Sequence, residues 1–222
     1  MDKRIIVAID GPAGAGKSTV ARAVAERLGY LHVDSGAMYR AVALWALENS
    51  IDPSDDHKVV PLCESADILL DGGRVFLNGR DITALIRTPE VSRAASRVSA
   101  IPGVRRELVL KQQEYAALSS IVMEGRDIGT VVYPRAQVKI YLDATPEVRA
   151  RRRVNEVGGD FADVLREIRE RDDRDATRAD SPLRQAEDAV YFDTGELDEE
   201  GVIVAVLRIV REKTSNGKGV TS

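Results

Sequence analysis

Cysteine, histidine and long apolar runs are scarce in this sequence of 222 residues, and each scarcity excludes a class of protein. The one cysteine, Cys63, cannot form a disulfide within the chain, so we expect it to pack in the interior of a protein from a reducing compartment. His32 and His57 are far apart and have no Cys or His companion at metal-ligand spacing, which argues against a zinc site. No run approaches the roughly 20 apolar residues that a membrane helix needs, so we expect a cytoplasmic protein with no membrane association.

The chain also lacks an excess of positive charge, because 32 Lys and Arg residues face 36 Asp and Glu residues. Affinity for DNA or RNA depends on a surplus of cations that neutralise phosphates, so a nucleic-acid polymer is not an expected partner. A small anion can still bind, since a pocket needs only local positive charge. The length fits one α/β domain with inserted pieces, or two small domains, and we take a monomer as the default state.

A glycine-rich loop follows the first apolar run of the chain. Residues 5–10 predict a strand, residues 11–18 match the pattern G-x-x-x-x-G-K-S, and an amphipathic helix then extends to Gly29. The N–H groups of such a loop surround a polyphosphate at a helix N-terminus, so Lys17 is expected to reach the β and γ phosphates and Ser18 to bind Mg²⁺. The alternative, a glycine-rich turn with an incidental Lys-Ser, is disfavoured by this context. The expected ATP-binding residues are Gly11, Pro12, Ala13, Gly14, Ala15, Gly16, Lys17, Ser18 and Thr19.

Polar residues follow several other predicted strands. Residues 31–33 predict a strand that leads through Asp34-Ser35-Gly36 into a helix from Ala37 to about Asn49. Ser35 can cap this helix or contact a ligand, and both explanations stay open; Tyr39 and Arg40 share its location. The strand at 121–124 leads into Gly125-Arg126-Asp127-Ile128-Gly129, and the strand at 138–143 leads into Thr145 as N-cap and Pro146 as first helical residue. Ligands bind at this carboxyl edge of open α/β sheets.

The pattern changes between residues 51 and 102. Two alternating strands joined by Asp71-Gly-Gly and followed by Asn78-Gly79 predict a small antiparallel hairpin, inserted into the β-α-β succession. Further expected elements are helices at 89–100 and, after the breaker Pro102-Gly103, at 104–118, a last strand at 189–193, a last helix at 198–211 with Val202, Val206, Ile209 and Val210 inside, and a disordered tail at 213–222.

Lysine is absent from residues 147–184, which hold ten arginines and ten acidic residues. A pair of salt-bridged surface helices explains this balance, and we retain that interpretation for Arg166, Arg169 and Arg184. The absence of lysine nevertheless favours phosphate binding, because the guanidinium fork grips phosphate oxygens in a bidentate manner. Two sets of residues share a helix face at this spacing: Arg171, Asp175 and Arg178, and, on the preceding helix, Arg149, Arg152 and Arg153.

A glycine-rich loop combined with arginines from several segments indicates phosphoryl transfer, in which alignment and charge neutralisation dominate. A hydroxyl acceptor would need a positioned Asp base, whereas a phosphate acceptor is already an anion near pH 7, and the many arginines favour the phosphate. Gly158-Gly159 could be the hinge of a lid that excludes water.

Three other classes compete with this interpretation. A guanine-nucleotide switch would need an N/T-K-x-D motif, which the sequence lacks. A kinase for a different small acceptor stays open, because Asp10 could be a Mg²⁺ group or a base for a hydroxyl. A regulatory module that binds a nucleotide without converting it is the third class, and it would not explain the arginine clusters.

The chain resembles the bacterial cytidylate kinases, a family of nucleoside monophosphate kinases, along nearly its whole length. The likeness rests on IDGPAGAGKST at 9–19, DSGAMYRA at 34–41, IRTPEVSRAAS at 86–96, EGRDIGTVVYP at 124–134, KIYLDA at 139–144 and ERDDRDATR at 170–178. The resemblance implies a single α/β domain with a P-loop NTPase three-layer core and a parallel sheet (1–50, 103–148 and 164–212). It also implies an inserted monophosphate-binding region containing the hairpin (51–102) and a short helical lid (about 149–163).

The resemblance further implies transfer of the γ-phosphate of ATP to CMP and dCMP, with UMP a poorer acceptor. Arg40, Arg126 and Arg178 would clamp the acceptor phosphate. Arg171 and Asp175 would lie toward the sugar, and Ser96, Arg105 and Asp127 would face the cytosine, whose amine suits a carboxylate and whose N3 and O2 suit an arginine. For Ser96, a small helix residue is an equal explanation. The expected catalytic residues are Lys17, Arg126, Arg178 and Arg153, and the substrate-binding set adds Ser35, Gly36 and Tyr39; the roles of Asp10 and Glu124 stay open.

Overall fold

The computed structural model describes residues 4–195 and 197–215. The chain divides into two compact units, which we call the core unit (residues 1–32 and 116–222) and the hairpin unit (residues 33–115). The boundaries fall inside one strand and one helix. Each unit has its own hydrophobic interior and is described by itself. Within the described ranges, no helix is both long enough and apolar enough to cross a lipid bilayer.

A five-stranded sheet runs through the core unit, as far as the described residues go. Its order is β2 (Leu31–Asp34), β6 (Ile121–Gly125), β1 (Ile6–Asp10), β7 (Val138–Asp143) and β8 (Val190–Asp193). Strand β1 is parallel to β6 and to β7, and β7 is parallel to β8. The register pairs Asp10 with Gly125 on one side and with Tyr141 on the other, so the carboxyl ends of these strands lie together. The predicted α/β fold with a parallel sheet is therefore confirmed.

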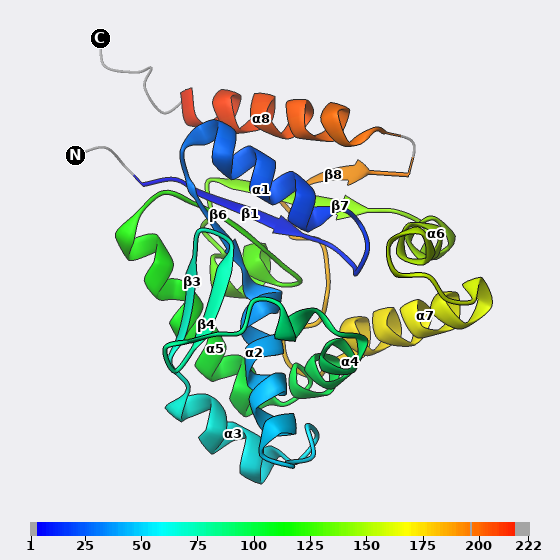
Figure 1. Cartoon of the computed structure of the whole chain (residues 1–222). Helices are drawn as coiled ribbons and strands as arrows, with labels where there is room; N and C mark the ends of the chain where they lie inside the picture. The colour runs from blue at the N-terminus through cyan, green and yellow to red at the C-terminus, as the bar shows by residue number, and fades with distance from the viewer. Residues whose placement is uncertain (1–3, 196, 216–222) are drawn as a thin grey trace. The chain divides into compact units, whose positions relative to one another are not determined.

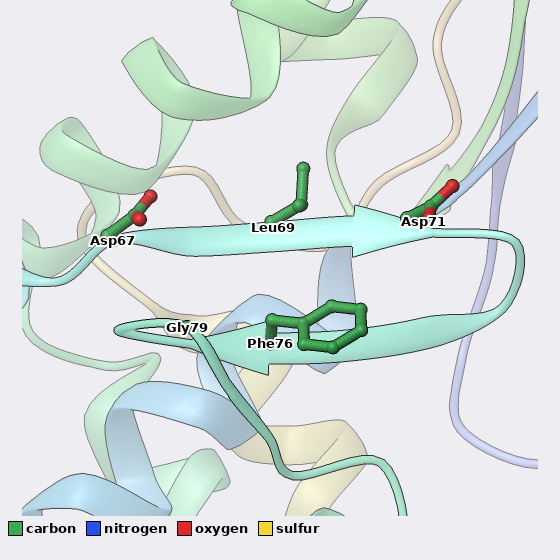
Figure 2. A pocket seen from close by; sticks show the side chains of 5 residues that line it. All are labelled: Asp67, Leu69, Asp71, Phe76 and Gly79. Atoms are coloured by element: carbon green, nitrogen blue, oxygen red, sulfur yellow. The ribbon is translucent and has the colours of Figure 1, made fainter.

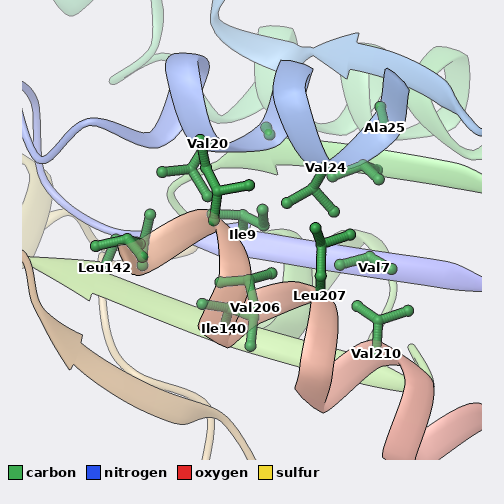
Figure 3. Close-up of a cluster of buried hydrophobic side chains, with 14 of the residues drawn as sticks. Val7, Ile9, Val20, Val24, Ala25, Ile140, Leu142, Val206, Leu207 and Val210 are labelled. Carbon is green, nitrogen blue, oxygen red and sulfur yellow. The ribbon is translucent and has the colours of Figure 1, made fainter. Parts of the chain in front are cut away.

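Helices α1 (Lys17–Leu28) and α8 (Glu199–Ser215) cover one face of this sheet, as Figures 1 and 3 show. Val20 and Val24 of α1 and Val206 and Val210 of α8 are buried against β1 and β7. Each such side chain contributes about 1.5–3 kcal/mol of burial energy. The predicted inner face of the last helix is thus confirmed, although Ile209 is only partly buried.

Helix α8 is longer than the sequence pattern indicated. It continues to Ser215, so the expectation of disorder is wrong for residues 213–215, and residues 216–222 lie outside the described chain. The segment carries Thr214, whose hydroxyl donates to the carbonyl of Val210 at 2.7 Å, one turn earlier. A polar composition therefore concealed a last helical turn.

Two helices of the core unit, α6 (Pro146–Val157) and α7 (Phe161–Thr177), contain the arginine-rich sequence and pack against each other (Figure 1). Thr145 caps α6 by accepting from the N–H of Val148 at 3.3 Å, which confirms the predicted start. Gly158 and Gly159, at φ 75° and 108°, form the connection to α7. Those angles lie in the region that favours glycine, so the pair permits the sharp reversal.

The hairpin unit packs helix α2 against α4 and contains most of α5. Its helices are α2 (Ser35–Glu48), α3 (Asp56–Ser65), the 3₁₀ turn η1 (Leu85–Arg87), α4 (Pro89–Val98) and α5 (Pro102–Leu118). The expectation that α5 begins after Pro102-Gly103 is wrong, since proline is tolerated at the first helical position. Gly103 is needed there, because a Cβ would lie 2.6 Å from Cγ2 of Val60.

Cys63 is fully buried, as predicted, and burial raises the pKa of its thiol to about 12.

The predicted hairpin is present as β3 (Ile68–Asp71) and β4 (Arg74–Leu77), and a third antiparallel strand, β5 (Arg80–Asp81), extends it. Gly72 and Gly73 take positive φ in the first turn, and Asn78 and Gly79 do so in the second. Two residues are too short for a period-2 pattern, which is why β5 was not predicted. Figure 2 shows a pocket on this sheet, lined by Asp67, Leu69, Asp71, Phe76 and Gly79.

Candidate active site

The glycine-rich loop connects β1 to α1 at the carboxyl edge of the sheet (Figure 1). Gly11 has φ 147°, and a Cβ there would lie 1.9 Å from the carbonyl oxygen of Leu142 in β7, so only glycine fits. Gly16, at φ 84°, is the N-cap of α1 and has no side chain to accept the N–H groups of the first turn. Such donors, together with the helix dipole, favour an anion at a helix N-terminus.

Lys17 is folded back over this loop. Its Nζ donates to the carbonyl of Pro12 at 2.6 Å, and the residue is only 6% exposed. Burial lowers the pKa of Lys17 well below its usual 10.5, and the charge of Arg126 lowers it further, against the opposing influence of Glu124. A bound polyphosphate would relieve this unfavourable burial of positive charge.

Ser18 is bonded to an acidic residue of the neighbouring strand β6. Its Oγ donates to Oε2 of Glu124 at 2.7 Å, and Nε2 of His32 lies 3.1 Å from Oε1 of the same carboxylate. Glu124 is 3% exposed. The sequence left the role of Glu124 open and gave His32 none, because the proximity of β2, β6 and α1 depends on the strand order. The signal that could have identified Glu124 is its acidic side chain near the carboxyl end of a predicted strand, where ligands bind in such sheets.

Asp10, at the end of β1, holds a short π-helical turn, η2 (Ile128–Val132). Its two carboxylate oxygens accept from the N–H groups of Ile128 and Gly129 at 2.8 and 2.7 Å. Burial raises the pKa of Asp10 to about 6, against the lowering effect of these two hydrogen bonds. Both carboxylate oxygens of Asp10 are thus engaged in fixing the η2 turn. The N-cap of this turn is Asp127.

An ionic cluster surrounds Asp175, a buried carboxylate near the end of α7, and includes Arg126 and Arg178. Nε of Arg126 donates to Oδ2 of Asp175 at 3.1 Å, and Nη1 of Arg178 lies 3.6 Å from Oδ1. Burial would raise the pKa of Asp175, but the charges of Arg126, Arg171 and Arg178 hold it below its usual value. The structure thus brings three residues together that are up to 52 positions apart in the sequence.

Of the four arginines of α6, the three that were predicted to share a face differ in their surroundings. Arg149 is 3% exposed and forms an ion pair with Asp172 of α7. Arg152 donates to the hydroxyl and the carbonyl of Thr194. The side chain of Arg153 is 39% exposed, with Glu156 3.7 Å away. The charged pairs of Arg166 and Arg169 lie on the surface, as predicted.

In the hairpin unit, Asp34 holds the start of α2. Its Oδ1 accepts from the N–H of Ala37 at 3.0 Å and its Oδ2 from Nη2 of Arg40 at 2.7 Å. The alternative that Ser35 caps the helix is therefore wrong, since Ser35 is the first helical residue and is buried. At Gly36, a Cβ would lie 3.3 Å from Nη1 of Arg40, so the glycine leaves room for the guanidinium.

Arg105 of α5 is also buried in the hairpin unit, at 2% exposure. Its Nη1 donates to the carbonyl of Ser99 at 3.2 Å, and its guanidinium lies 5.6 Å from the ring centre of Tyr39. Ser96 of α4 is buried as well. Contact with an aromatic face stabilises a buried cation by about 0.5–2 kcal/mol.

The fold and the loop define the class of protein. A parallel sheet, a glycine loop that begins a helix, a lysine bent over that loop and a serine bonded to an acid on the adjacent strand are the parts of a P-loop nucleotide-binding protein. A gluconokinase structure from Sinorhizobium meliloti 1021 shares the fold, with a TM-score of 0.51, 15% identity and coverage of 98% of this chain and 100% of that one.

Sequence comparison identifies the family. The family model described as cytidylate kinase matches residues 7–212. A cytidylate kinase of Solibacter usitatus is 53% identical over 223 residues, covering 97% of this chain and 96% of the relative, and one of Bacillus subtilis is 45% identical, covering 96% and 100%. The chain belongs to the cytidylate kinase family and is an enzyme, which confirms the resemblance predicted from the motifs.

Proposed function

We propose that this enzyme transfers the γ-phosphate of ATP to CMP and to dCMP, forming CDP and dCDP, and that it uses UMP less well. The observation that carries the proposal is the coexistence, in the core unit, of the Lys17 loop with the Arg126–Asp175–Arg178 cluster. The first has the donors for a polyphosphate, and the second has guanidinium groups for the phosphate of an acceptor. Membership of the cytidylate kinase family supports cytidine as the nucleoside.

On the donor side, residues 11–19 bind the phosphates of ATP through backbone N–H groups, and Lys17 neutralises the transferred group. Mg²⁺ fits the residues present, because the Ser18 hydroxyl and the Glu124 carboxylate are oxygen ligands of the kind that this ion prefers. When bound, the ion neutralises charge on the β and γ phosphates. We assign Asp10 to the η2 turn, since both of its oxygens already accept backbone hydrogen bonds.

On the acceptor side, Arg40, Arg126 and Arg178 bind the phosphate of CMP. Arg171 and Asp175 bind the sugar. The remaining residues of the proposed set bind the nucleoside and its base: Ser35, Gly36, Tyr39, Ser96, Arg105 and Asp127. Asp127 accepts from the exocyclic amine of cytosine, and uracil, which presents a carbonyl there, is disfavoured because a buried unpaired group costs about 1–3 kcal/mol.

The phosphate of CMP attacks in line without a protein base, because it is already an anion near pH 7. Lys17, Arg126 and Arg178 stabilise the charge that spreads over the equatorial oxygens, and Arg153 contacts the transferred group when the lid (about residues 149–163) closes. Exclusion of water then prevents hydrolysis of ATP. We further propose a single kinase domain with a monophosphate-binding insert at 51–102, in a cytoplasmic monomer.

A different small hydroxyl acceptor is the competing function. It would require Asp10 as base, and the engagement of both Asp10 oxygens argues against that role. The decisive assay couples ADP formation to a spectroscopic signal with CMP, dCMP, UMP, AMP, GMP, dTMP and shikimate as acceptors. We expect turnover with CMP and dCMP, less with UMP and none with shikimate. Turnover confined to an acceptor without cytosine would exclude the proposal.

A further inference from the structure

Arg149 joins three separate parts of the core unit. Its Nε donates to the carbonyl of Ala144 at 2.8 Å, and its Nη1 donates to the carbonyl of Ala13 in the glycine loop at 3.1 Å. Nη1 and Nη2 also donate to the two carboxylate oxygens of Asp172, at 3.1 and 2.6 Å. A buried guanidinium with a bidentate carboxylate is the strong, geometrically specific form of ion pair.

The two partners of Arg149 belong to different halves of the proposed reaction. Ala13 lies in the loop assigned to ATP. Asp172 lies on α7, next to Arg171 and one turn before Asp175, which are assigned to the acceptor. Arg149 also restricts the loop sterically, because a Cβ added at Gly14 would lie 3.2 Å from the Cβ of Arg149.

Helix α7 is consequently held at two points. Asp175 accepts a hydrogen bond from Arg126, which follows β6. Asp172 accepts one from Arg149, which also donates to the carbonyl of Ala13 in the glycine loop. An acceptor nucleotide that fixes Arg171 and Asp175 would also restrict the position of Asp172, since all three are on the same rigid helix. Restricting Asp172 restricts Arg149 and the carbonyl of Ala13.

We propose that Arg149 and Asp172 are positioning residues that couple the two substrate sites, so that CMP bound to α7 orders the loop that binds ATP. The inference rests on the proposed function, because it takes α7 as part of the acceptor site. It gives Arg149 a role distinct from contact with the transferred phosphoryl group. The coupling is reciprocal: ATP strengthens CMP binding by the same factor as CMP strengthens ATP binding.

The experiment measures the Kd of a non-hydrolysable ATP analogue with Mg²⁺ by titration calorimetry, with and without saturating CMP. The ratio of the two values is the coupling factor, and we expect about 5-fold or more in the unmodified enzyme, the lower end of typical couplings. Asp172→Asn preserves the shape of the side chain but removes its charge, and we expect the factor to fall close to 1. The matched control is Asp173→Asn, the exposed neighbour on the same helix, which should retain the full factor.

A second variant keeps the test independent of folding. Arg149→Lys retains a positive charge but cannot bond Ala13 and both oxygens of Asp172 together, and we expect the same loss of coupling. In the double variant Arg149→Lys with Asp172→Asn, the coupling factor should be no lower than in either single variant. The reason is that both substitutions remove the same connection. Thermal unfolding verifies that each variant is folded.

Three results would overturn the inference while leaving the proposed function intact. One is a coupling factor of 1 in the unmodified enzyme despite CMP binding and turnover. Another is an unchanged factor in Asp172→Asn. The third is a loss of kcat in Arg149→Lys with unchanged coupling, which would place Arg149 on the transferred group. Absence of CMP binding and of CMP turnover would overturn both proposals.

Discussion

The core unit and the hairpin unit differ in how deeply the ion pairs of their arginines are buried. In the core unit, Arg126 and Arg149 are paired with the carboxylates of Asp175 and Asp172. In the hairpin unit, the pair of Arg40 with Asp34 leaves more of both side chains exposed, 28% of each. Removing one partner of a buried ion pair leaves an uncompensated charge and costs about 3–5 kcal/mol, whereas an ion pair that solvent reaches contributes about 0–1 kcal/mol. The core unit should therefore respond to charge changes with large losses of activity, and the hairpin unit with smaller ones.

The largest effect is expected from Lys17→Ala. Lys17 is a buried cation of the loop. Its loss removes the charge that we propose lies opposite the transferred phosphate. We expect kcat to fall by about 10³-fold or more with every acceptor. Steady-state kinetics with CMP and UMP provide the measurement, and a loss restricted to one acceptor would contradict the assignment of Lys17 to the donor.

A smaller effect is expected from Arg126→Lys. The substitution keeps the charge but loses the fork that bonds Asp175, and we expect kcat/KM for CMP to fall about 100-fold. The control is Arg169→Lys, whose partner Glu147 lies on the surface and whose pair contributes about 0–1 kcal/mol. Equal effects of the two substitutions would remove the distinction between buried and exposed pairs.

Asp127→Ala should alter selectivity more than rate. Loss of the carboxylate removes the acceptor proposed for the cytosine amine, so the preference for CMP over UMP should fall about 10-fold, within the 1–3 kcal/mol of an unpaired polar group. The ratio of the two kcat/KM values is the measurement, with Asp71→Ala on the exposed sheet as control. If both values fell by the same factor, Asp127 would not discriminate between the bases.

The smallest effect concerns the pH dependence of stability. The pKa of Asp10 is raised from 3.8 to about 6, so the folded protein binds this proton more tightly than the unfolded chain. The resulting stabilisation is complete below pH 3.8 and is lost as the pH rises through 6. From pH 7 to pH 5, we expect the free energy of unfolding to rise by about 1 kcal/mol relative to Asp10→Asn. Urea unfolding at the two pH values tests this, and a constant difference would refute it.

Strands and caps were predictable where local chemistry decides them. The loop at 11–18, the strand at 138–143 and the Thr145-Pro146 helix start follow from residue type and spacing alone. The Asp34 cap could not be separated from a Ser35 cap, because both residues have the right side chain and only the backbone angles decide. Strand β5 was too short to leave a pattern.

Contacts between distant segments were not predictable in the same way. The alignment of Arg171, Asp175 and Arg178 indicated a phosphate-binding face, but the ion pair between Arg149 and Asp172 depends on how α6 packs against α7. The contact of His32 with Glu124 likewise depends on β2 lying beside β6. The periodicity of apolar residues predicts which face of a helix or strand is buried. It does not predict which residue of another element packs against that face.

Cys63 has a practical consequence for testing the proposed lid. Its thiol is fully buried and its pKa is raised to about 12, so almost no reactive thiolate exists at neutral pH. A cysteine introduced at an exposed position such as Val157, at the end of α6, would be the group that a maleimide dye labels. A fluorophore can therefore be attached beside the Gly158-Gly159 connection without first replacing Cys63, and its signal would show whether this segment moves as nucleotides bind.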